Sequence, residues 1–323
     1  MSRGLGDVYK RQRIHHPLDA RQIPDEPVVL AMGFFDGVHR GHQAVIARAK
    51  ALAQEKQAKL AVLTYDHHPA LVYRPLEADD RKYLSIPTRK LQQLERLGVE
   101  RVFLVNYTGE FASQSPQEFV DHYLVAFHTV VAVAGFDHTY GKKDVATMDR
   151  LADYAKGRFT VETVAQEAQD QQKISSTRIR QAMKQGDIDL ANQLLGYPYR
   201  STGVVVHGEA RGRTIGYPTA NILTPENQWL PGIGIYTARL KVGAIWYPGM
   251  VSIGRNVTFG DGRPITVEMN LLDFQGNLYG EPVEVEWQHR LRGEIKFADA
   301  DGLVDQLQQD ERETRAYFQR LTQ

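Results

Sequence analysis

The chain reads VVLAMGFFDGVHRGH at residues 28–42, where a short apolar run leads directly into a glycine-containing loop. The helix expected from Gly41 onward carries apolar residues at spacings of three and four, which gives it one buried stripe of Val45, Ile46, Ala49, Leu52 and Ala53. A strand that passes through such a loop into a helix leaves free backbone N–H groups at the helix start, where the helix dipole also favours negative charge. The sequence therefore predicts a phosphate-binding site in this loop.

Short β-branched runs alternate with helical patterns up to about residue 195, which is typical of a parallel sheet with helices on both faces. The predicted strands span 28–33, 59–65, 101–106, 129–135 and 158–163. The later predicted helices span 87–97, 115–127, 145–156, 175–183 and 187–195. This part of the chain is therefore predicted to be an α/β domain.

Beyond Gly196 the pattern changes to strands separated by turn residues, with almost no helix between them. These strands are expected at 202–207, 234–242, 251–253, 266–272 and 283–287. Such a pattern favours an antiparallel β-barrel. A last amphipathic helix is expected at about 300–321.

The change of pattern and the length of 323 residues predict two domains, because this length exceeds the usual size of a single core. We place the first domain at 13–185 and the second at 186–323. Residues 1–12 show neither an apolar period nor a connection to the rest of the chain. We interpret them as a non-native vector or assembly scar.

Composition narrows the class of protein. Lys plus Arg and Asp plus Glu both number 39, which argues against a nucleic-acid-coating role, because that role needs excess positive charge. The absence of cysteine excludes disulfides, thiolate metal sites and cysteine nucleophiles. No apolar run approaches the roughly 18 residues of a membrane helix. We expect a cytoplasmic protein without nucleic-acid or membrane partners, and a transient homo-oligomer stays open.

Two histidines stand out in the first loop. His39 and His42 are three residues apart across Gly41, so both imidazoles can lie near one anionic group. Donating from their ring nitrogens, they could stabilise charge that develops when an α-phosphate is attacked and pyrophosphate leaves. The alternative is that they are ordinary surface or capping histidines. Metal binding is less favoured, because no carboxylate or third histidine is placed with them.

The loop resembles the His-x-Gly-His motif of the nucleotidyltransferase superfamily, in the form FDGVHxGH that is typical of prokaryotic FAD synthetases. Three later segments are similar to the same family: LTYDHHP at 63–69, GFDHTYGK at 135–142 and ISSTRIR at 174–180. The resemblance implies a Rossmann-like fold. It implies catalytic roles for His39 and His42, ATP binding by Gly33, Phe34, Gly41, Ser175, Ser176, Thr177 and Arg178, and flavin binding by Asp66, His68, Asp137 and Tyr140. Residues 175–177 would also serve as a plain helix cap.

One position departs from the family. Where FAD synthetases usually have Gly-Asn-Phe-Asp, this chain has Gly33-Phe34-Phe35-Asp36. An aromatic ring thus replaces an amide, and the lost hydrogen bond would cost about 1 kcal/mol. We expect weaker ATP binding at this site, with adenylyl transfer retained.

A second loop, from Gly208 to Gly216, offers glycines and arginines but lacks the Gly-Lys-Ser/Thr ending of a Walker A loop. Thr219 and Asn221 follow it, and residues two apart in extended backbone point the same way. Their oxygen atoms suit magnesium, which prefers oxygen ligands with room for water and phosphate. The alternative is that residues 218–221 are only a turn that enters a strand.

This region resembles the riboflavin kinase motif Gly-Arg-x-x-Gly-x-Pro-Thr-Ala-Asn-Ile, and the likeness extends over 186–323. The family more often reads Arg-Pro-Thr-Phe where this chain reads RNVTF at 255–259, which we expect to alter a loop only. The resemblance implies that Glu268 is the catalytic base, although it could be a solvent-facing strand glutamate. It further implies ATP binding by Gly208, Arg211, Gly212, Arg213 and Gly216, magnesium binding by Thr219 and Asn221, and flavin binding by Arg292 and Phe297.

The two resemblances together imply a bifunctional enzyme. Its barrel would convert riboflavin and ATP to FMN and ADP, and its α/β domain would convert FMN and ATP to FAD and pyrophosphate. Mg²⁺ would accompany ATP, and no permanently bound cofactor is expected. One alternative is a riboflavin kinase whose nucleotidyltransferase domain is weak or accepts a different compound. Another is a non-catalytic flavin-binding regulator, which would be expected to lose Glu268 or His42, and both are present.

Overall fold

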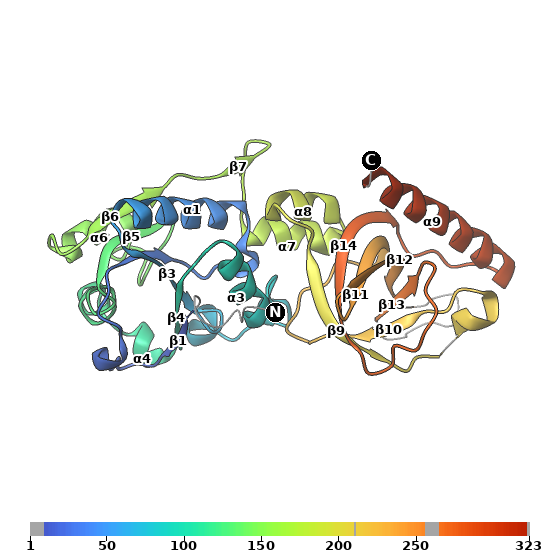
Figure 1. The fold of residues 1–323 in the computed structure, drawn as a ribbon, viewed down its shortest axis with the longest axis horizontal. Coiled ribbons are helices and arrows are strands. Elements are labelled where there is room, and N and C mark those ends of the chain that lie inside the picture. The colour runs from blue at the N-terminus through green and yellow to red at the C-terminus, as the bar shows by residue number, and fades with distance from the viewer. Residues whose placement is uncertain (1–9, 210, 256–264, 322–323) are drawn as a thin grey trace, which may run out of the picture. The chain divides into compact units, whose positions relative to one another are not determined.

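The structure is a computed structural model that describes residues 10–209, 211–255 and 265–321. The chain divides into two compact units, Met1–Ser176 and Thr177–Gln323 (Figure 1). The boundary that we predict from sequence, at 185/186, coincides with the end of helix α7 (Ser176–Gln185). Almost all of this helix belongs to the second unit. Independent folding of the two units stays a prediction.

A six-stranded parallel sheet forms the centre of the first unit, in the order β1-β4-β3-β2-β5-β6. Its strands are β1 (Lys10–Ile14), β2 (Val28–Met32), β3 (Lys59–Tyr65), β4 (Arg101–Val105), β5 (Thr129–Gly135) and β6 (Thr160–Val164). From β2 the chain builds β3 and β4 on one side and then β5 and β6 on the other. The strand order therefore reverses next to β2, and open parallel sheets bind ligands at the carboxyl ends of strands at such a point.

Helices cover both faces of this sheet, as the sequence predicts. On one face α1 (Arg40–Glu55) and α3 (Pro87–Arg96) pack against Val29 and Ala31 of β2. On the other face α5 (Pro116–Phe119), the π-helix η4 (Val120–Val125) and α6 (Met148–Ala155) share a core with Leu30. Because successive side chains of a strand point to opposite faces, a strand covered on both sides is apolar throughout. All five residues of β2 are buried accordingly.

Short elements complete the first unit. They are the 3₁₀ turns η1 (Ala20–Gln22), η2 (Asp36–Val38) and η3 (Asp79–Arg81), the helices α2 (Ala70–Tyr73) and α4 (Gly109–Ala112), and the small hairpin of β7 (Ala168–Gln169) and β8 (Gln172–Lys173). The sequence pattern did not indicate the hairpin, because two-residue strands carry no period.

Strand β1 corrects our interpretation of the N-terminus. Residues 10–12, which we assigned to an unconnected scar, pair in parallel with Arg101, Val102 and Phe103 of β4. An edge strand is held by backbone hydrogen bonds, which any side chain permits, so the missing apolar period did not exclude a strand here. Residues 1–9 lie outside the described residues.

Deletion of residues 1–12 is therefore expected to lower the melting temperature, contrary to what an unconnected segment would do. The deletion removes three of the five residues of β1 and leaves only Arg13 and Ile14, the latter 2% exposed, in the edge strand. A loss of about 1–3 kcal/mol, the usual range for a destabilising change, would be visible by differential scanning calorimetry. An unchanged melting temperature would show that the pairing with β4 contributes nothing to stability.

The second unit is a closed antiparallel barrel, which confirms the predicted architecture. Its strands are β9 (Arg200–Val206), β10 (Ala220–Leu223), β11 (Gly234–Val242), β12 (Ile245–Gly254), β13 (Thr266–Leu271) and β14 (Pro282–Arg292), closed in the order β10-β13-β12-β11-β14-β9. Fully buried Tyr236 and Trp287 meet edge to face in its core, with ring centroids 5.5 Å apart. The unit also contains α7, α8 (Ile188–Leu195), the 3₁₀ turn η5 (Arg211–Ile215) and α9 (Ala300–Leu321), which lies alongside β12 (Figure 1).

Three strands of the barrel differ clearly from the prediction, and one of them, β14, continues to Arg292 where its end was expected at residue 287. β12 begins at Ile245 rather than at residue 251, because Pro248 and Gly249, which read as turn residues, lie within the strand. A Cβ on Gly249 would stand 2.2 Å from the carbonyl oxygen of Asn270, so this glycine permits close approach of β13. β10 was not among the predicted strands, although its first residues belong to the segment 218–221, which we interpreted as a metal-binding motif or as a turn that enters a strand. The variant loop at Asn256 and Val257 lies outside the described residues.

Candidate active sites

A cavity of about 370 Å³ lies at the carboxyl ends of the parallel strands, next to the reversal in strand order. Its wall is formed by the segments after β2, β5 and β6, the end of β3, the first turn of α1 and the residues at the start of α7. The predicted site residues that line it are Gly33, Phe34, His39, Gly41, His42, Asp137, Ser175 and Ser176. Tyr65 and Pro69 of the segment 63–69 line it as well, so all four of the quoted motifs, far apart along the chain, meet around one cavity.

The two motif histidines lie together at the start of α1. His39 is the N-cap residue, and its Nδ1 accepts a hydrogen bond from the backbone N–H of His42 at 3.4 Å. The two imidazoles stack with centroids 3.6 Å apart. Burial, assisted by the positive charge of Lys173, lowers the pKa of His39 to about 4, and burial lowers the pKa of His42 well below its usual value. Both rings are therefore neutral at pH 7. His39 is a capping histidine, which does not prevent it from facing a substrate.

The loop between β2 and α1 has a strained backbone. Phe35 (φ 54°), Gly37 (φ 78°) and Val38 (φ 38°) all adopt left-handed conformations. A positive φ is costly for a β-branched residue such as Val38, of order 1–3 kcal/mol, and persists only where the surrounding structure holds it. One such restraint is Gln43, whose Nε2 donates to the carbonyl of Val38 at 2.8 Å. Strain of this kind collects at functional sites.

Two further residues in the wall were not singled out from sequence. Lys173 pairs with the carboxylate of Asp137, and its Nζ lies 5.2 Å from the ring centroid of Phe136. His138 has a buried Nε2 for which the described residues provide no hydrogen-bond partner, and burial lowers its pKa to about 4. His138 lies within the GFDHTYGK segment, so that motif was the available signal for it. No sequence signal pointed to Lys173, because it lies in a two-residue strand.

Other predicted residues of the first unit do not line the cavity. The carboxylate of Asp66 accepts hydrogen bonds from Asn106 Nδ2 at 2.6 Å and from the backbone N–H of Tyr107 at 3.2 Å. His68 Nδ1 accepts from the backbone N–H of Ala70 at 3.1 Å. Tyr140 is buried, and burial raises the pKa of its phenol. Their flavin-binding roles stay predictions, as do the ATP-binding roles of Thr177 and Arg178, which belong to the second unit.

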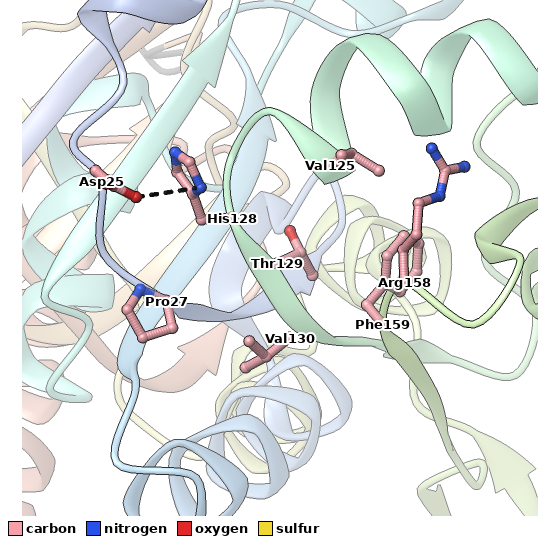
Figure 2. A pocket seen from close by; sticks show the side chains of 8 residues that line it. All are labelled: Asp25, Pro27, Val125, His128, Thr129, Val130, Arg158 and Phe159. Atoms are coloured by element: carbon pink, nitrogen blue, oxygen red, sulfur yellow. Dashed lines mark ion pairs between the residues drawn. The ribbon is translucent and has the colours of Figure 1, made fainter.

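A second hollow of the first unit, of about 320 Å³, lies at the opposite end of the sheet (Figure 2). It is formed near the amino ends of β2 and β5, where His128 lies 3.7 Å from the carboxylate of Asp25. None of the predicted site residues lines this hollow. It is therefore separate from the candidate active site.

The predicted kinase residues converge on strands β10 and β13 of the barrel. Asn221 stands opposite Glu268 in the strand pairing, and cross-strand partners share one face of a sheet. Thr219 Oγ1 donates to Glu268 Oε2 at 3.3 Å, and Thr266 Oγ1 donates to Glu268 Oε1 at 3.1 Å. The neighbours of Glu268 in β13, Val267 and Met269, are buried in the core, so the carboxylate stands on the other face of the strand. Two hydroxyls, an amide and a carboxylate thus share one small region.

The glycine loop packs against this group. A Cβ on Gly208 would lie 2.1 Å from Asn221 Nδ2, so a larger residue here would displace the side chain of Asn221. A Cβ on Gly212 would lie 2.1 Å from the carbonyl oxygen of Tyr217, and Gly216 has a φ of 84°. Arg213 Nη2 donates to the phenol oxygen of Tyr279 at 3.2 Å. The side chain of Arg211 lies outside the described part of the chain.

The predicted flavin residues of the barrel have structural contacts of their own. Arg292 forms a two-point ion pair with Asp310 of α9, with Nε to Oδ1 at 2.9 Å and Nη2 to Oδ2 at 2.7 Å. Asp310 is 1% exposed, so this pair fastens α9 to the end of β14. Phe297 is half-buried in the segment between β14 and α9. A flavin-binding role for Arg292 and Phe297 stays a prediction.

A cavity beside a helix start at a strand-order reversal, and a carboxylate beside oxygen donors on a barrel, are typical of an ATP-dependent transferase. A family model described as FAD synthetase matches residues 21–178, and one described as riboflavin kinase matches residues 195–318. The chain belongs to the family of bifunctional riboflavin kinase/FMN adenylyltransferases, and it catalyses both reactions.

Individual relatives agree over nearly the whole chain. The bifunctional riboflavin kinase/FMN adenylyltransferase of Listeria monocytogenes is 46% identical, with 95% of this chain and 98% of the relative covered. That of Bacillus subtilis is 40% identical, with 97% and 99% covered. A solved structure described as a macrolide-efflux protein from Streptococcus pneumoniae has a TM-score of 0.86 and 38% identity, and covers 94% of this chain and 98% of its own. In the part of the chain that the structure describes, no helix is long and apolar enough to cross a membrane.

Proposed function

We propose that the two reactions occur at the two sites described above, one in each unit. The cavity of the first unit transfers the adenylyl group of ATP to FMN and releases pyrophosphate. The Glu268 region of the second unit transfers the γ-phosphate of ATP to riboflavin. The observation that carries this division is the gathering of Asn221 and Glu268 on adjacent barrel strands, with Thr219 directly before the first of them, while His39 and His42 line a cavity of the other unit.

Adenylyl transfer uses the start of α1. The phosphate of FMN attacks the α-phosphorus of ATP, a new P–O–P linkage forms, and the bond to pyrophosphate breaks. Negative charge develops on the oxygens of the α-phosphate and of the leaving pyrophosphate. The positive end of α1 stabilises this charge, and so do N–H donors of His39 and His42. Because burial keeps both imidazoles neutral, they act as hydrogen-bond donors rather than as fixed charges.

Phosphorylation of riboflavin uses the carboxylate of Glu268. The carboxylate accepts the proton of the 5′-hydroxyl as the oxygen attacks the γ-phosphorus, and ADP leaves. The hydroxyl of Thr219 and the amide oxygen of Asn221 fit Mg²⁺, whose remaining ligands would be phosphate oxygens and water. When bound, Mg²⁺ neutralises charge on the phosphates of ATP. Hydrogen bonds from Thr219 and Thr266 orient the carboxylate of Glu268.

The substrates are accordingly ATP, riboflavin and FMN, which are small soluble compounds. A cytoplasmic location fits this substrate set, because ATP is available there. The direct test is a dual assay, in which purified protein and MgATP receive either riboflavin or FMN, and FMN and FAD are then separated by chromatography. A substitution in one site should stop one reaction only, either FMN formation from riboflavin or FAD formation from supplied FMN, and equal loss of both reactions would contradict the assignment of one reaction to each unit.

Phe34→Asn is expected to lower the KM for ATP in FAD formation. The ring of Phe34 lies in the cavity wall, 5.0 Å from the ring of His68, at the position where the family usually has an amide. Restoring one hydrogen bond to the nucleotide, worth about 1 kcal/mol, corresponds to about a fivefold change in apparent affinity. Phe34→Ala serves as the control, because it removes the ring without adding an amide. If Asn and Ala gave the same KM, the amide would have no partner in this site.

A further inference from the structure

Lys90 on α3 is a buried cation next to the loop of the adenylyl-transfer site. Its side chain is 3% exposed. Its Nζ donates to the carbonyl of Phe34 at 3.1 Å, to Thr64 Oγ1 at 3.1 Å and to the carbonyl of Tyr65 at 3.0 Å. An ammonium group has three N–H donors, so all of them are used. Burial of a charge costs free energy unless the charge is paired and hydrogen-bonded. An apolar side chain at this position would avoid that cost.

A second set of hydrogen bonds joins the loop to the region of α3, and here a side chain of the loop contacts the backbone before α3. The carboxylate of Asp36 is 2% exposed and accepts hydrogen bonds from the backbone N–H groups of Leu84 at 3.2 Å and Ser85 at 3.0 Å. Ser85 Oγ in turn donates to Gln93 Oε1 of α3 at 2.9 Å. The segment from Leu84 to the end of α3 therefore holds the loop on both sides of Phe35. Neither tie contacts the interior of the cavity directly, since Lys90 and Asp36 are absent from its lining.

The loop that these ties hold is the one with the left-handed residues Phe35, Gly37 and Val38. Such a backbone is retained only when its surroundings fix it. The same loop ends at His39, which caps α1 and stacks on His42. A shift at the Phe34 carbonyl would therefore be passed along five residues to both imidazoles.

We propose that Lys90 is a positioning residue for adenylyl transfer: by holding the Phe34 carbonyl at the ends of β2 and β3, it sets the path of residues 34–38 and thereby the placement of His39 and His42. It acts through the loop and not by contact with substrate. The proposal rests on the function proposed for the cavity.

The charge state of Lys90 should make FAD formation depend on pH, which a purely structural role would not do. Burial lowers the pKa of Lys90 to about 8, against the opposing attraction of the carboxylates of Asp36 and Asp66. The other titratable group that senses it is His42, whose own pKa is lowered in part by this charge. Below pH 8 the ammonium keeps three donors. Above pH 8 the neutral amine keeps two, so one of the three acceptors loses its hydrogen bond from Lys90.

The test compares Lys90→Met with Arg96→Met in the full chain. Met retains the length of the Lys90 stem and removes the donors, whereas Arg96 is an exposed cation of the same helix. For Lys90→Met we expect kcat for FAD formation to fall about 10- to 100-fold, because small misplacements of catalytic groups have effects of this size. The KM values for FMN and ATP should change less than about threefold, since the affected interaction acts in the transition state. FMN formation by the same chain, and both activities of Arg96→Met, should be unchanged.

The pH profile supplies the second measurement. In the unsubstituted protein the ratio of FAD formation to FMN formation should decline above pH 8, and in Lys90→Met the ratio should not show this decline. If Lys90→Met cannot be purified in folded form, Thr64→Val tests the same junction, because Thr64 Oγ1 accepts from Lys90 and donates to the Phe34 carbonyl at 2.9 Å. That variant should lower kcat for FAD formation and leave FMN formation intact.

A normal kcat for FAD formation in folded Lys90→Met would overturn the proposal. If Thr64→Val is used instead, a normal kcat in that variant would overturn it. So would a loss confined to KM. Failure of the underlying site assignment is recognised separately, because His42→Ala would then leave FAD formation intact. If His42→Ala stops FAD formation and Lys90→Met does not, only the positioning role of Lys90 is wrong.

Discussion

Glu268→Gln is expected to reduce kcat for FMN formation by about 10²–10⁴-fold, which is the usual contribution of a general base. The substitution keeps the shape of the side chain, and its amide can still meet the hydroxyls of Thr219 and Thr266. It removes the group that takes the proton of the 5′-hydroxyl of riboflavin. FAD formation from supplied FMN should persist at the unsubstituted rate, because that reaction uses the other unit.

Glu281→Gln is the matched control, since Glu281 is an exposed glutamate of the same unit, next to β14. It should leave both activities unchanged. The measurement is the initial rate of FMN formation at saturating riboflavin and MgATP. An unaffected rate in Glu268→Gln would remove Glu268 from the mechanism and return it to the role of an ordinary strand glutamate.

His42→Ala is expected to reduce FAD formation by about 10²–10³-fold while FMN formation continues, because loss of one donor to developing charge has an effect of this size. The ring of His42 lies in the cavity wall, stacked on His39, and is neutral at pH 7 because it is buried. Riboflavin supplied to this variant should therefore accumulate as FMN.

The control for this variant is His15→Ala, which removes an exposed histidine from the same unit. Circular dichroism of both variants would show whether α1 remains intact, since the backbone N–H of His42 also takes part in the cap. Parallel loss of FMN and FAD formation in His42→Ala would indicate damage to the whole protein and would contradict a local role.

The sequence was sufficient for the architecture because both patterns are strongly periodic. The buried β2, with all five residues apolar, and the stripe of α1 from Val45 to Ala53 indicate a covered parallel sheet. It was also sufficient for most of the first cavity, since its residues come from motifs that follow strands directly. That Thr219 and Asn221 lie on the same side of the chain near Glu268 could be predicted only from the side-chain period of extended backbone.

The sequence was insufficient where long-range backbone pairing or buried charge decides the structure. Residues 10–12 join the sheet through backbone hydrogen bonds to β4, which leave no trace in side-chain pattern. Lys90 could have been noticed as a charged residue in the buried stripe of α3, one turn before Leu94, but its acceptors lie on β3 and on the loop after β2. Asp66 and Arg292 were predicted from resemblance alone, and their partners Asn106 and Asp310 could not be anticipated.

A fragment of residues 177–323 shows whether each reaction belongs to one unit. The fragment begins at Thr177 rather than near Gln185, because α7 belongs to the second unit and the carbonyl of its Met183 accepts the N–H of Gly232 at 2.7 Å. It contains Thr219, Asn221 and Glu268. We measure FMN and FAD by chromatography after incubation with MgATP and either riboflavin or FMN. We expect FMN from riboflavin and no FAD from FMN. If the fragment is folded by circular dichroism yet cannot phosphorylate riboflavin, or if it makes FAD, the two reactions are not divided between the units in this way.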